Sequence, residues 1–268
     1  MRPTTDLKLL EDVRNQLDVQ VHDGTTEGMI DLVARVKPDL AYHVASRFVS
    51  QHVSADVEPL VRSNVLFGAQ LAEALAVQKV PHLVNIGTSW QNYEDREYSP
   101  VCLYAATKQA MEAILQFYVE TGRLRVTTLR LFDTYGPGDP RPKLLSLLLR
   151  IADTGETLDM SPGGQLQDIV FIDDVVDALL LAGARMRNGA GAAAMQVFAV
   201  SSGKPVPLKQ LVAAFAEAYA RPVSIRWGGK PYREREVMVP WSLGTPVPGW
   251  SPRVSLEEGL RRTLGAHV

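Results

Sequence analysis

Hydrophobic and polar positions repeat with two different periods along the chain, and each change of period separates a strand from a helix. A period near 3.6 residues indicates a helix with one buried face, whereas alternation or a short apolar run indicates a strand. Residues 26–36 have the helical spacing and end before Pro38, whereas 125–132 is a run rich in Val, Thr and Leu. The first half is therefore predicted to contain strands at 18–22, 39–44, 82–86 and 125–132 and helices at 26–36, 57–78 and 104–120.

The second half is less regular but continues the alternation. Strands are predicted at 168–172 and 195–200, and helices at 144–152, 173–186, 207–219 and after Ser255. Strand–helix–strand order favours right-handed crossovers and a parallel sheet, so the predicted fold is a doubly wound α/β fold. We expect residues 1–139, with about 168–187, to form the domain that contains the sheet, and residues 140–268 to form a smaller lobe.

Composition narrows the class of protein further. The chain has 268 residues, 46% of them hydrophobic and 22% charged, which is ordinary for a globular protein with its own core. A net charge of -2 argues against nucleic acid or an anionic membrane surface as a partner. The single cysteine, Cys102, excludes an internal disulfide, and no Cys or His spacing is typical of a zinc site. With no apolar signal sequence and no run near the ~20 residues that span a bilayer, we expect a cytoplasmic protein without a metal.

The strongest chemical signal is the pair Tyr104 and Lys108. Residues four apart share one face of a helix, and an ammonium beside a phenol favours the phenolate and lowers the pKa of the tyrosine. Such a tyrosine exchanges protons with a carbonyl or hydroxyl group near neutral pH. A surface pair without chemistry is the alternative interpretation of the same spacing.

Several motifs in order resemble one enzyme family. From about residue 39 to 264 the chain is similar to extended short-chain dehydrogenases/reductases of the NAD-dependent epimerase/dehydratase family, which have a Rossmann-like fold. Within it, the sugar-nucleotide 4-ketoreductases of the CDP-abequose synthase type are nearest. The matching segments are 43–46 (His-Val-Ala-Ser), Asn64, 103–108 (Leu-Tyr-Ala-Ala-Thr-Lys), 129–139, 163–168, 170–174, 231–236 and 248–250.

The resemblance implies roles for particular residues. Tyr104 would donate the proton, with Lys108 as its partner and Thr88 as a third catalytic group, and the lobe at 140–268 would bind the substrate. The residues implied to bind NADP(H) or NAD(H) are Arg2, Asp23, Ala45, Ser46, Asn64, Tyr104 and Lys108. Those implied to bind a nucleotide sugar are Ser89, Asp133, Gln167, Arg226 and Arg233, although Arg226 and Arg233 are equally typical of a solvated charged face. A homodimer through helices 57–78 and 104–120 is also implied.

The chain departs from the family at three places. The Gly-rich turn that cradles the cofactor pyrophosphate is missing, so by this comparison the fold is truncated at the N-terminus. A longer natural protein, a segment supplied by another protomer, and a rearranged minimal fold are the alternatives. Ile86 stands where the family has a catalytic Ser or Thr, and Thr88 shares its face only if the strand continues. Asp133 and Gln167 replace the usual Asn and Arg.

Three functions follow from these observations. The first is an NAD(P)-dependent reductase or epimerase of a nucleotide-activated 4-keto-6-deoxy sugar, with Arg2 favouring NADP. The second is an enzyme on the same scaffold that uses Tyr104 and Lys108 for isomerisation, elimination or cyclisation, without a cofactor. The third is a degenerate, non-catalytic subunit. Titration with NADPH and NADH separates the first from the others.

Overall fold

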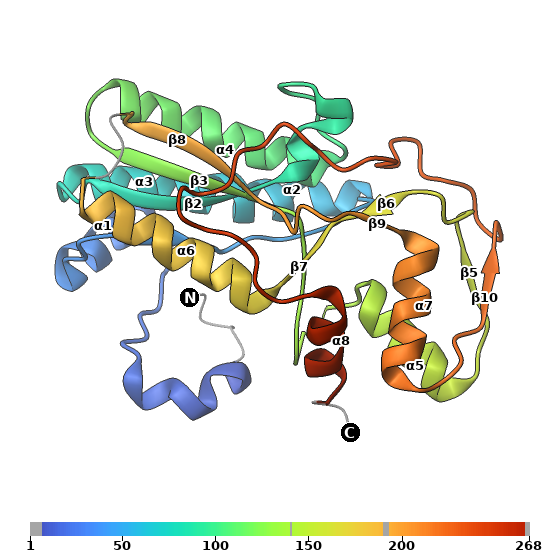
Figure 1. Ribbon diagram of the computed structural model, residues 1–268. Coiled ribbons are helices and arrows are strands. Elements are labelled where there is room, and N and C mark those ends of the chain that lie inside the picture. The colour runs from blue at the N-terminus through green and yellow to red at the C-terminus, as the bar shows by residue number, and fades with distance from the viewer. Residues whose placement is uncertain (1–6, 140, 190–192, 266–268) are drawn as a thin grey trace.

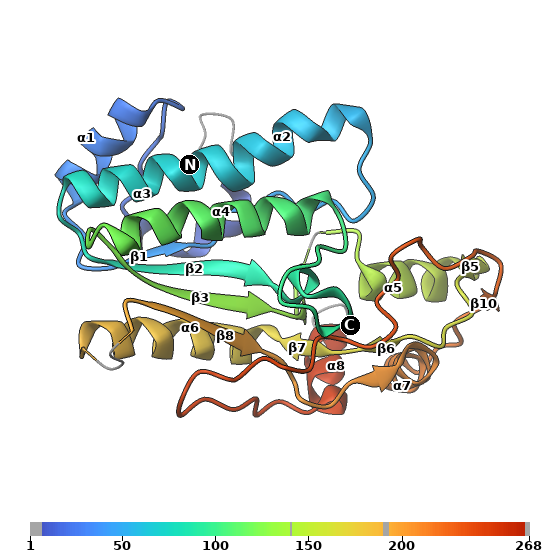
Figure 2. The same cartoon turned by 90° about the horizontal axis from the view of Figure 1, so that it is seen from above.

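The core of the molecule is one parallel sheet. The computed structural model describes residues 7–139, 141–189 and 193–265. In the described part the sheet has four strands in the order β1 (Ala41–His43), β2 (His82–Thr88), β3 (Arg125–Leu131) and β8 (Met195–Val200). All neighbouring pairs are parallel, which confirms the predicted α/β class (Figures 1 and 2).

Helices cover both faces of the sheet. α1 (Thr26–Val36), α3 (Phe67–Val77) and α4 (Leu103–Glu120) lie over one face, and α6 (Ile172–Arg187) lies over the other (Figure 2). Side chains alternate between the two layers as the pleat requires. Leu83 of β2 is buried with α3 and α4, whereas its neighbour Val84 is buried with α6.

The predicted strand at 18–22 is not formed, which corrects that prediction. A strand requires a hydrogen-bonded neighbour, and β1 pairs with β2 on one side and with no other strand of the described residues. The segment instead follows a 3₁₀ helix at Lys8–Gln16 and reaches α3, where the His22 ring lies 3.3 Å from the Gln70 amide oxygen. Its alternating pattern therefore reflects one buried residue, His22, rather than a place in the sheet.

A second group of elements packs beside the carboxyl ends of the strands (Figure 1). Its helices are α5 (Leu144–Thr154), α7 (Leu208–Tyr219) and α8 (Leu256–Gly265), which share their own apolar cluster. Three separate pairs of short strands accompany these helices: β4 (Asp133–Tyr135) pairs with β7 (Ile169–Phe171), β5 (Leu158–Met160) with β10 (Ile225–Trp227), and β6 (Leu166–Gln167) with β9 (Val206–Pro207).

β8 belongs to the main sheet. Residues 195–200 fall inside the segment 140–268, yet β8 pairs with β3 along its whole length. The reason is topological: α6 supplies the crossover that returns the chain to the sheet after β7. The division of the remaining residues between two lobes stays a prediction.

A long C-terminal segment returns over the sheet. This strap, residues 237–250, hydrogen-bonds β6 through Met238 and β8 through Thr245. Val247 and Trp250 then enter the core beside Val84 and Leu129. In Figure 1 the strap is the red trace that crosses in front of the strands and descends to α8.

One continuous helical run has the length and apolar composition of a membrane span. It covers Ser54–Val77 and includes α2 (Val57–Val61), and it is the one such run in the described residues. Core helices of globular proteins pass the same test, and this run packs against α1 and α4.

Candidate active site

Tyr104 and Lys108 lie one turn apart near the start of α4. The Lys108 Nζ atom is 6.0 Å from the centre of the Tyr104 ring. Lys108 is 2% exposed, and its Nζ has no hydrogen-bond partner within the part of the chain that the structure describes. Burial lowers the pKa of Lys108 to about 8, and the negative charge of Glu112 opposes this shift. An ammonium that is buried without a partner is a group prepared to contact a ligand.

The Tyr104 phenol lies near two hydroxyl groups from different strand ends. Phe48 packs edge-on against its ring at 5.0 Å, and the hydroxyl groups of Ser46 and Thr88 lie close enough to affect its pKa. Burial raises the pKa of Tyr104 to about 12, and the two hydroxyl groups oppose the rise. The lowered pKa expected from Lys108 is therefore not found in this structure, because desolvation of the phenolate outweighs an ammonium at this distance.

Thr88 occupies the position that the sequence left conditional. β2 continues to Thr88, so Ile86 and Thr88 leave the strand on the same side. Ile86 packs into the cluster under α6, while Thr88, at the carboxyl end, reaches the phenol and caps the turn Ser89–Gln91 by accepting the Trp90 N–H. Ser89 follows and lines an adjacent cavity.

Asn64 fixes the segment that carries Ser46. Its side chain accepts hydrogen bonds from the Arg47 N–H and the Ser46 hydroxyl, and it donates to the Arg47 carbonyl and to Thr107 of α4. Asn64 lies in a π-helical turn, Arg62–Leu66, a widening that is common at functional sites. The sequence grouped Ala45, Ser46 and Asn64; the structure places them together and adds the contact between Ser46 and Tyr104.

Two cavities lie beside neighbours of this pair: Phe48, which packs on the Tyr104 ring, lines one of about 420 Å³, and Ser89 lines one of about 70 Å³. Trp90, Asp133, Gln167 and Arg233 line both of them. Asp133 borders both cavities. Desolvation of its carboxylate by the surrounding protein raises its pKa, and the positive charges of Lys143 and Arg233 oppose this rise. The structure thus brings together three of the residues that the sequence assigned to the substrate.

The cationic side chains of the larger cavity are already paired. Arg233 binds Glu236 through two hydrogen bonds of 2.7 and 3.0 Å. Arg141 binds Asp139 in the same forked manner, and Lys143 donates to the Thr134 carbonyl. Trp90, Arg141 and Lys143 are cavity residues that sequence reasoning missed; the basic residues directly after 136–140 were the available signal.

Other predicted residues lie elsewhere or outside the described chain. Asp23 accepts hydrogen bonds from Thr25 at the start of α1 and is exposed. Arg226 is 69% exposed on β10 and pairs with Asp159, and it is not among the described residues that line the two cavities. Arg2 lies outside the described residues.

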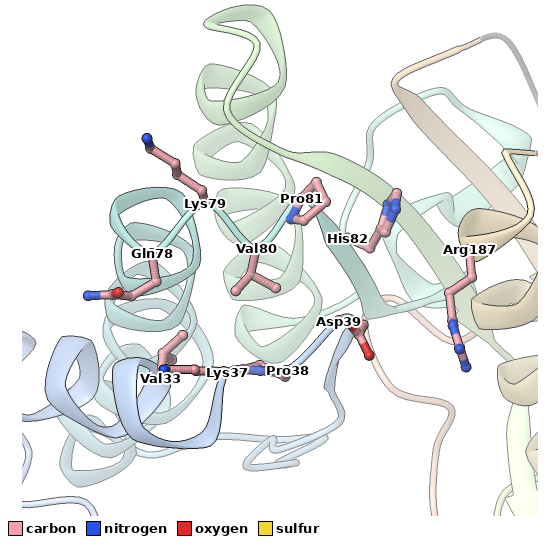
Figure 3. A pocket seen from close by; sticks show the side chains of 10 residues that line it. All are labelled: Val33, Lys37, Pro38, Asp39, Gln78, Lys79, Val80, Pro81, His82 and Arg187. Carbon is pink, nitrogen blue, oxygen red and sulfur yellow. The ribbon is translucent and has the colours of Figure 1, made fainter.

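A larger hollow lies at the opposite edge of the sheet. It has a volume of about 620 Å³ and is lined by residues that precede β1 and β2, among them Asp39 and Pro81. The charged ends of Lys79 and Arg187 point in opposite directions there (Figure 3). Ligands of open α/β sheets bind outside the carboxyl ends of the strands. The carboxyl ends near Tyr104 are therefore the stronger candidate for the site.

Comparison with known proteins finds relatives that match most of the chain. The CDP-abequose synthase of Yersinia pseudotuberculosis is 25% identical over 217 residues, which cover 81% of this chain and 74% of the relative. The UDP-glucose 4-epimerase of Mycolicibacterium smegmatis is 29% identical over 248 residues, 87% of this chain and 77% of the relative.

Solved structures share the fold. MoeE5 in complex with UDP-glucuronic acid and NAD superposes with a TM-score of 0.78 at 24% identity, over 92% of this chain and 84% of MoeE5. The UDP-glucose 4-epimerase of Thermotoga maritima, solved with UDP-glucose, has a TM-score of 0.80 at 22% identity, over 95% and 86% of the two chains. The sequence model of the NAD dependent epimerase/dehydratase family matches residues 7–197. The chain therefore belongs to the NAD-dependent epimerase/dehydratase family, whose members here are enzymes of the extended short-chain dehydrogenase/reductase type.

Proposed function

We propose that this enzyme is an NAD(P)-dependent reductase or epimerase that acts on a nucleotide-activated 4-keto-6-deoxy sugar and uses Tyr104 as the proton donor. The observation that carries the proposal is the Tyr104 phenol near the hydroxyl groups of Ser46 and Thr88, with Phe48, which packs on its ring, lining a cavity of about 420 Å³. Among the relatives are CDP-abequose synthases and a dTDP-6-deoxy-L-talose 4-dehydrogenase, and their names supply the sugar class.

The residues at the strand ends fit the nicotinamide-ribose half of the cofactor. The unpartnered Nζ of Lys108 offers donors to ribose hydroxyls, and the exposed segment at Ala45 and Ser46 gives access from solvent. When bound, NAD(P) supplies or accepts the hydride. Its identity is left open by the neighbours, since MoeE5 was solved with NAD and the RMD protein of Pseudomonas aeruginosa with NADPH.

The chain's own residues handle the proton. With a pKa of about 12, the Tyr104 phenol stays protonated at neutral pH and can donate to a developing alkoxide. The hydroxyl groups of Ser46 and Thr88 then stabilise the phenolate that remains, and Lys108 adds positive charge from the same helix face.

The cavity supplies groups for the rest of the substrate. Arg141 and Arg233 present planar forks that match diphosphate oxygens once each exchanges its carboxylate partner for the ligand. Leu144, Leu145 and Met160 provide an apolar wall. Gln167 contributes an amide where a positive charge is common, so we expect weaker binding of the diphosphate than in relatives with arginine there.

Calorimetric titration with NADPH and NADH, followed by turnover of nucleotide 4-ketosugars, tests the proposal. We expect binding of one of them in the micromolar range and a loss of turnover of about 100-fold or more in Tyr104→Phe. Tyr98→Phe is the matched control, because Tyr98 is 53% exposed and does not line either cavity. A folded chain that binds neither dinucleotide would overturn the redox role and leave acid–base chemistry at Tyr104.

A further inference from the structure

A buried ion pair lies under the loop that follows β2. Arg130 of β3 and Glu112 of α4 are joined by hydrogen bonds of 2.7 and 3.3 Å, and their side chains are 10% and 4% exposed. The Glu112 oxygen Oε1 also accepts a hydrogen bond of 2.8 Å from the Gln91 amide, which leaves both carboxylate oxygens occupied. The pair is therefore part of the interior, where an unpaired charge is costly.

The backbone makes room for this pair. Gly87 of β2 stands directly opposite Arg130 in the sheet register. A Cβ atom at Gly87 would lie 2.8 to 3.0 Å from Gln91, Glu112 and Arg130, closer than side chains tolerate. Arg130 further donates to the Asn92 side chain at 2.7 Å and lies 5.6 Å from the Trp241 ring of the strap. The Arg130 guanidinium is thus contacted by a carboxylate, an amide and an aromatic ring, and the glycine opposite leaves space for its side chain.

Glu112 lies one helical turn after Lys108, on the same face of α4. A carboxylate and an ammonium at this spacing attract each other, and burial strengthens the attraction. Yet the two side chains form no ion pair, and the Nζ of Lys108 has no partner in the described part of the chain. The two oxygens of Glu112 are turned instead toward Arg130 and Gln91.

We propose that Arg130 is a positioning residue that holds the Glu112 carboxylate away from Lys108 and so keeps the Lys108 ammonium free for Tyr104 and its ligand. Without Arg130, the carboxylate would remain buried and its nearest available cation would be Lys108. The ammonium would then be engaged in an internal ion pair rather than exposed to the phenol. The geometry of both residues supports this assignment independently of which substrate binds.

The other groups facing Lys108 do not take over this role. Tyr104 stays protonated near neutral pH, since burial raises its pKa to about 12. His43 of β1 is neutral there, because burial lowers its pKa to about 4. Asn92 and Gln91 are uncharged, and Trp241 offers only its ring to Arg130. Glu112 is the carboxylate that acts on Lys108 and Arg130 is the cation that neutralises it.

NMR titration of the full-length protein with ¹³C-labelled lysine tests the proposal, with the Lys108 signal assigned from Lys108→Met. In Arg130→Gln we expect the Lys108 midpoint to rise by about one pH unit, because Glu112 then pairs with it. In the double variant Arg130→Gln/Glu112→Gln the midpoint should return to the parent value or fall below it. Arg123→Gln is the control, since Arg123 is partly exposed and lies near Glu73. The Lys108 midpoint should not move in this variant.

Two results contradict the proposal. One is a folded Arg130→Gln protein whose Lys108 midpoint equals that of the parent. The other is a rise that persists in the double variant, which would trace it to general loosening rather than to Glu112. If Arg130→Gln does not fold, Arg130→Lys replaces it. One ammonium cannot hold both Glu112 and Asn92, so we expect a smaller rise of the Lys108 midpoint. The absence of any rise in Arg130→Lys would overturn the proposal. The readout needs no substrate, so it stands or falls separately from the redox function.

Discussion

At the scale of single residues, the site depends on two hydroxyl groups that reach one buried phenol. Ser46 follows β1 and Thr88 ends β2, so the surroundings of the phenol depend on the relative position of two strand ends. Burial alone would favour a permanently protonated tyrosine. The Ser46 and Thr88 hydroxyl groups oppose the rise in pKa, so we expect them to stabilise the phenolate during a reaction.

Replacing Thr88 by Val tests this division of labour. We expect kcat for reduction of a nucleotide 4-ketosugar to fall by roughly 10- to 100-fold, the value of one hydrogen bond to a charged group, while KM changes little. Ile86→Val is the control on the same side of the strand: it should cost about 1 kcal/mol of stability and leave kcat unchanged, because Ile86 packs under α6. Equal kcat losses in both variants would contradict the role of Thr88.

His43 makes stability depend on pH. Burial lowers its pKa from 6.5 to about 4, although a hydrogen-bond contact with Asn85 opposes the shift. Between these values the unfolded chain binds a proton that the folded chain excludes, so stability is lost as pH falls from 6.5 toward 4. The full loss is about 3 kcal/mol.

Urea unfolding at several pH values measures this loss. His43→Gln should flatten the dependence between pH 6.5 and 4, even if it lowers stability at pH 7.5. His52→Gln removes an exposed histidine and should retain the slope of the parent. A parental slope in His43→Gln would assign the acid sensitivity to other groups.

At the scale of elements, local pattern was sufficient where one element keeps a single period from end to end. The helix at 26–36 and the strand at 195–200 have the predicted bounds, and α1 buries Met29 and Val33, which lie one turn apart on one face. Pattern was insufficient at 18–22, because pairing requires a second strand, which no local sequence encodes. It also could not show that β8 returns to the main sheet, since that depends on where α6 ends.

The contact between β2, β3 and α4 predicts the effect of a single methyl group. Gly87→Ala places a Cβ against three buried side chains that hydrogen-bond one another and cannot move separately. We expect a loss of roughly 1–3 kcal/mol in the free energy of unfolding, measured by urea denaturation. Gly164→Ala is the control, because Gly164 is exposed and a Cβ atom there would meet a single side-chain atom, the Tyr232 hydroxyl oxygen at 3.0 Å. Comparable losses in both would show that no crowding is specific to Gly87.

At the scale of the whole molecule, we expect the helical face of α3 and α4 to pack against a second copy. α4 exposes Ala110, Ala113 and Phe117 on one stripe, and Phe117 is 54% exposed. The family resemblance implies a homodimer through these helices, and a stripe of small and apolar residues allows close helix packing.

Sedimentation velocity at micromolar concentration tests the dimer. The parent should sediment as a dimer and Ala113→Arg as a monomer, because a buried arginine without a partner disrupts the interface. Leu180→Arg is the control, since Leu180 is exposed on α6 on the opposite side of the sheet (Figure 2). A monomeric parent, or dissociation in the control alone, would place the interface elsewhere.

The candidate site was predictable only in part. The pairing of Tyr104 with Lys108 follows from spacing on one helix, whereas Thr88 was implied by the family resemblance together with the alternation of a strand. The pairing of Arg141 with Asp139, and the place of Asp133 beside two cavities, depend on which loops meet in space. The rise in the pKa of Tyr104 depends on burial, and no spacing rule measures burial.

The strap also sets the order in which the protein is completed during its synthesis. Val247 and Trp250 are core residues, and Asp174 of α6 holds the Arg253 and Val254 amides, so the sheet is covered by a part of the chain that is made after the sheet itself. Until that part leaves the ribosome, Phe132 lacks the Trp241 ring that stacks on it in the folded protein. We therefore expect the growing chain to present an apolar surface to chaperones that the folded enzyme covers.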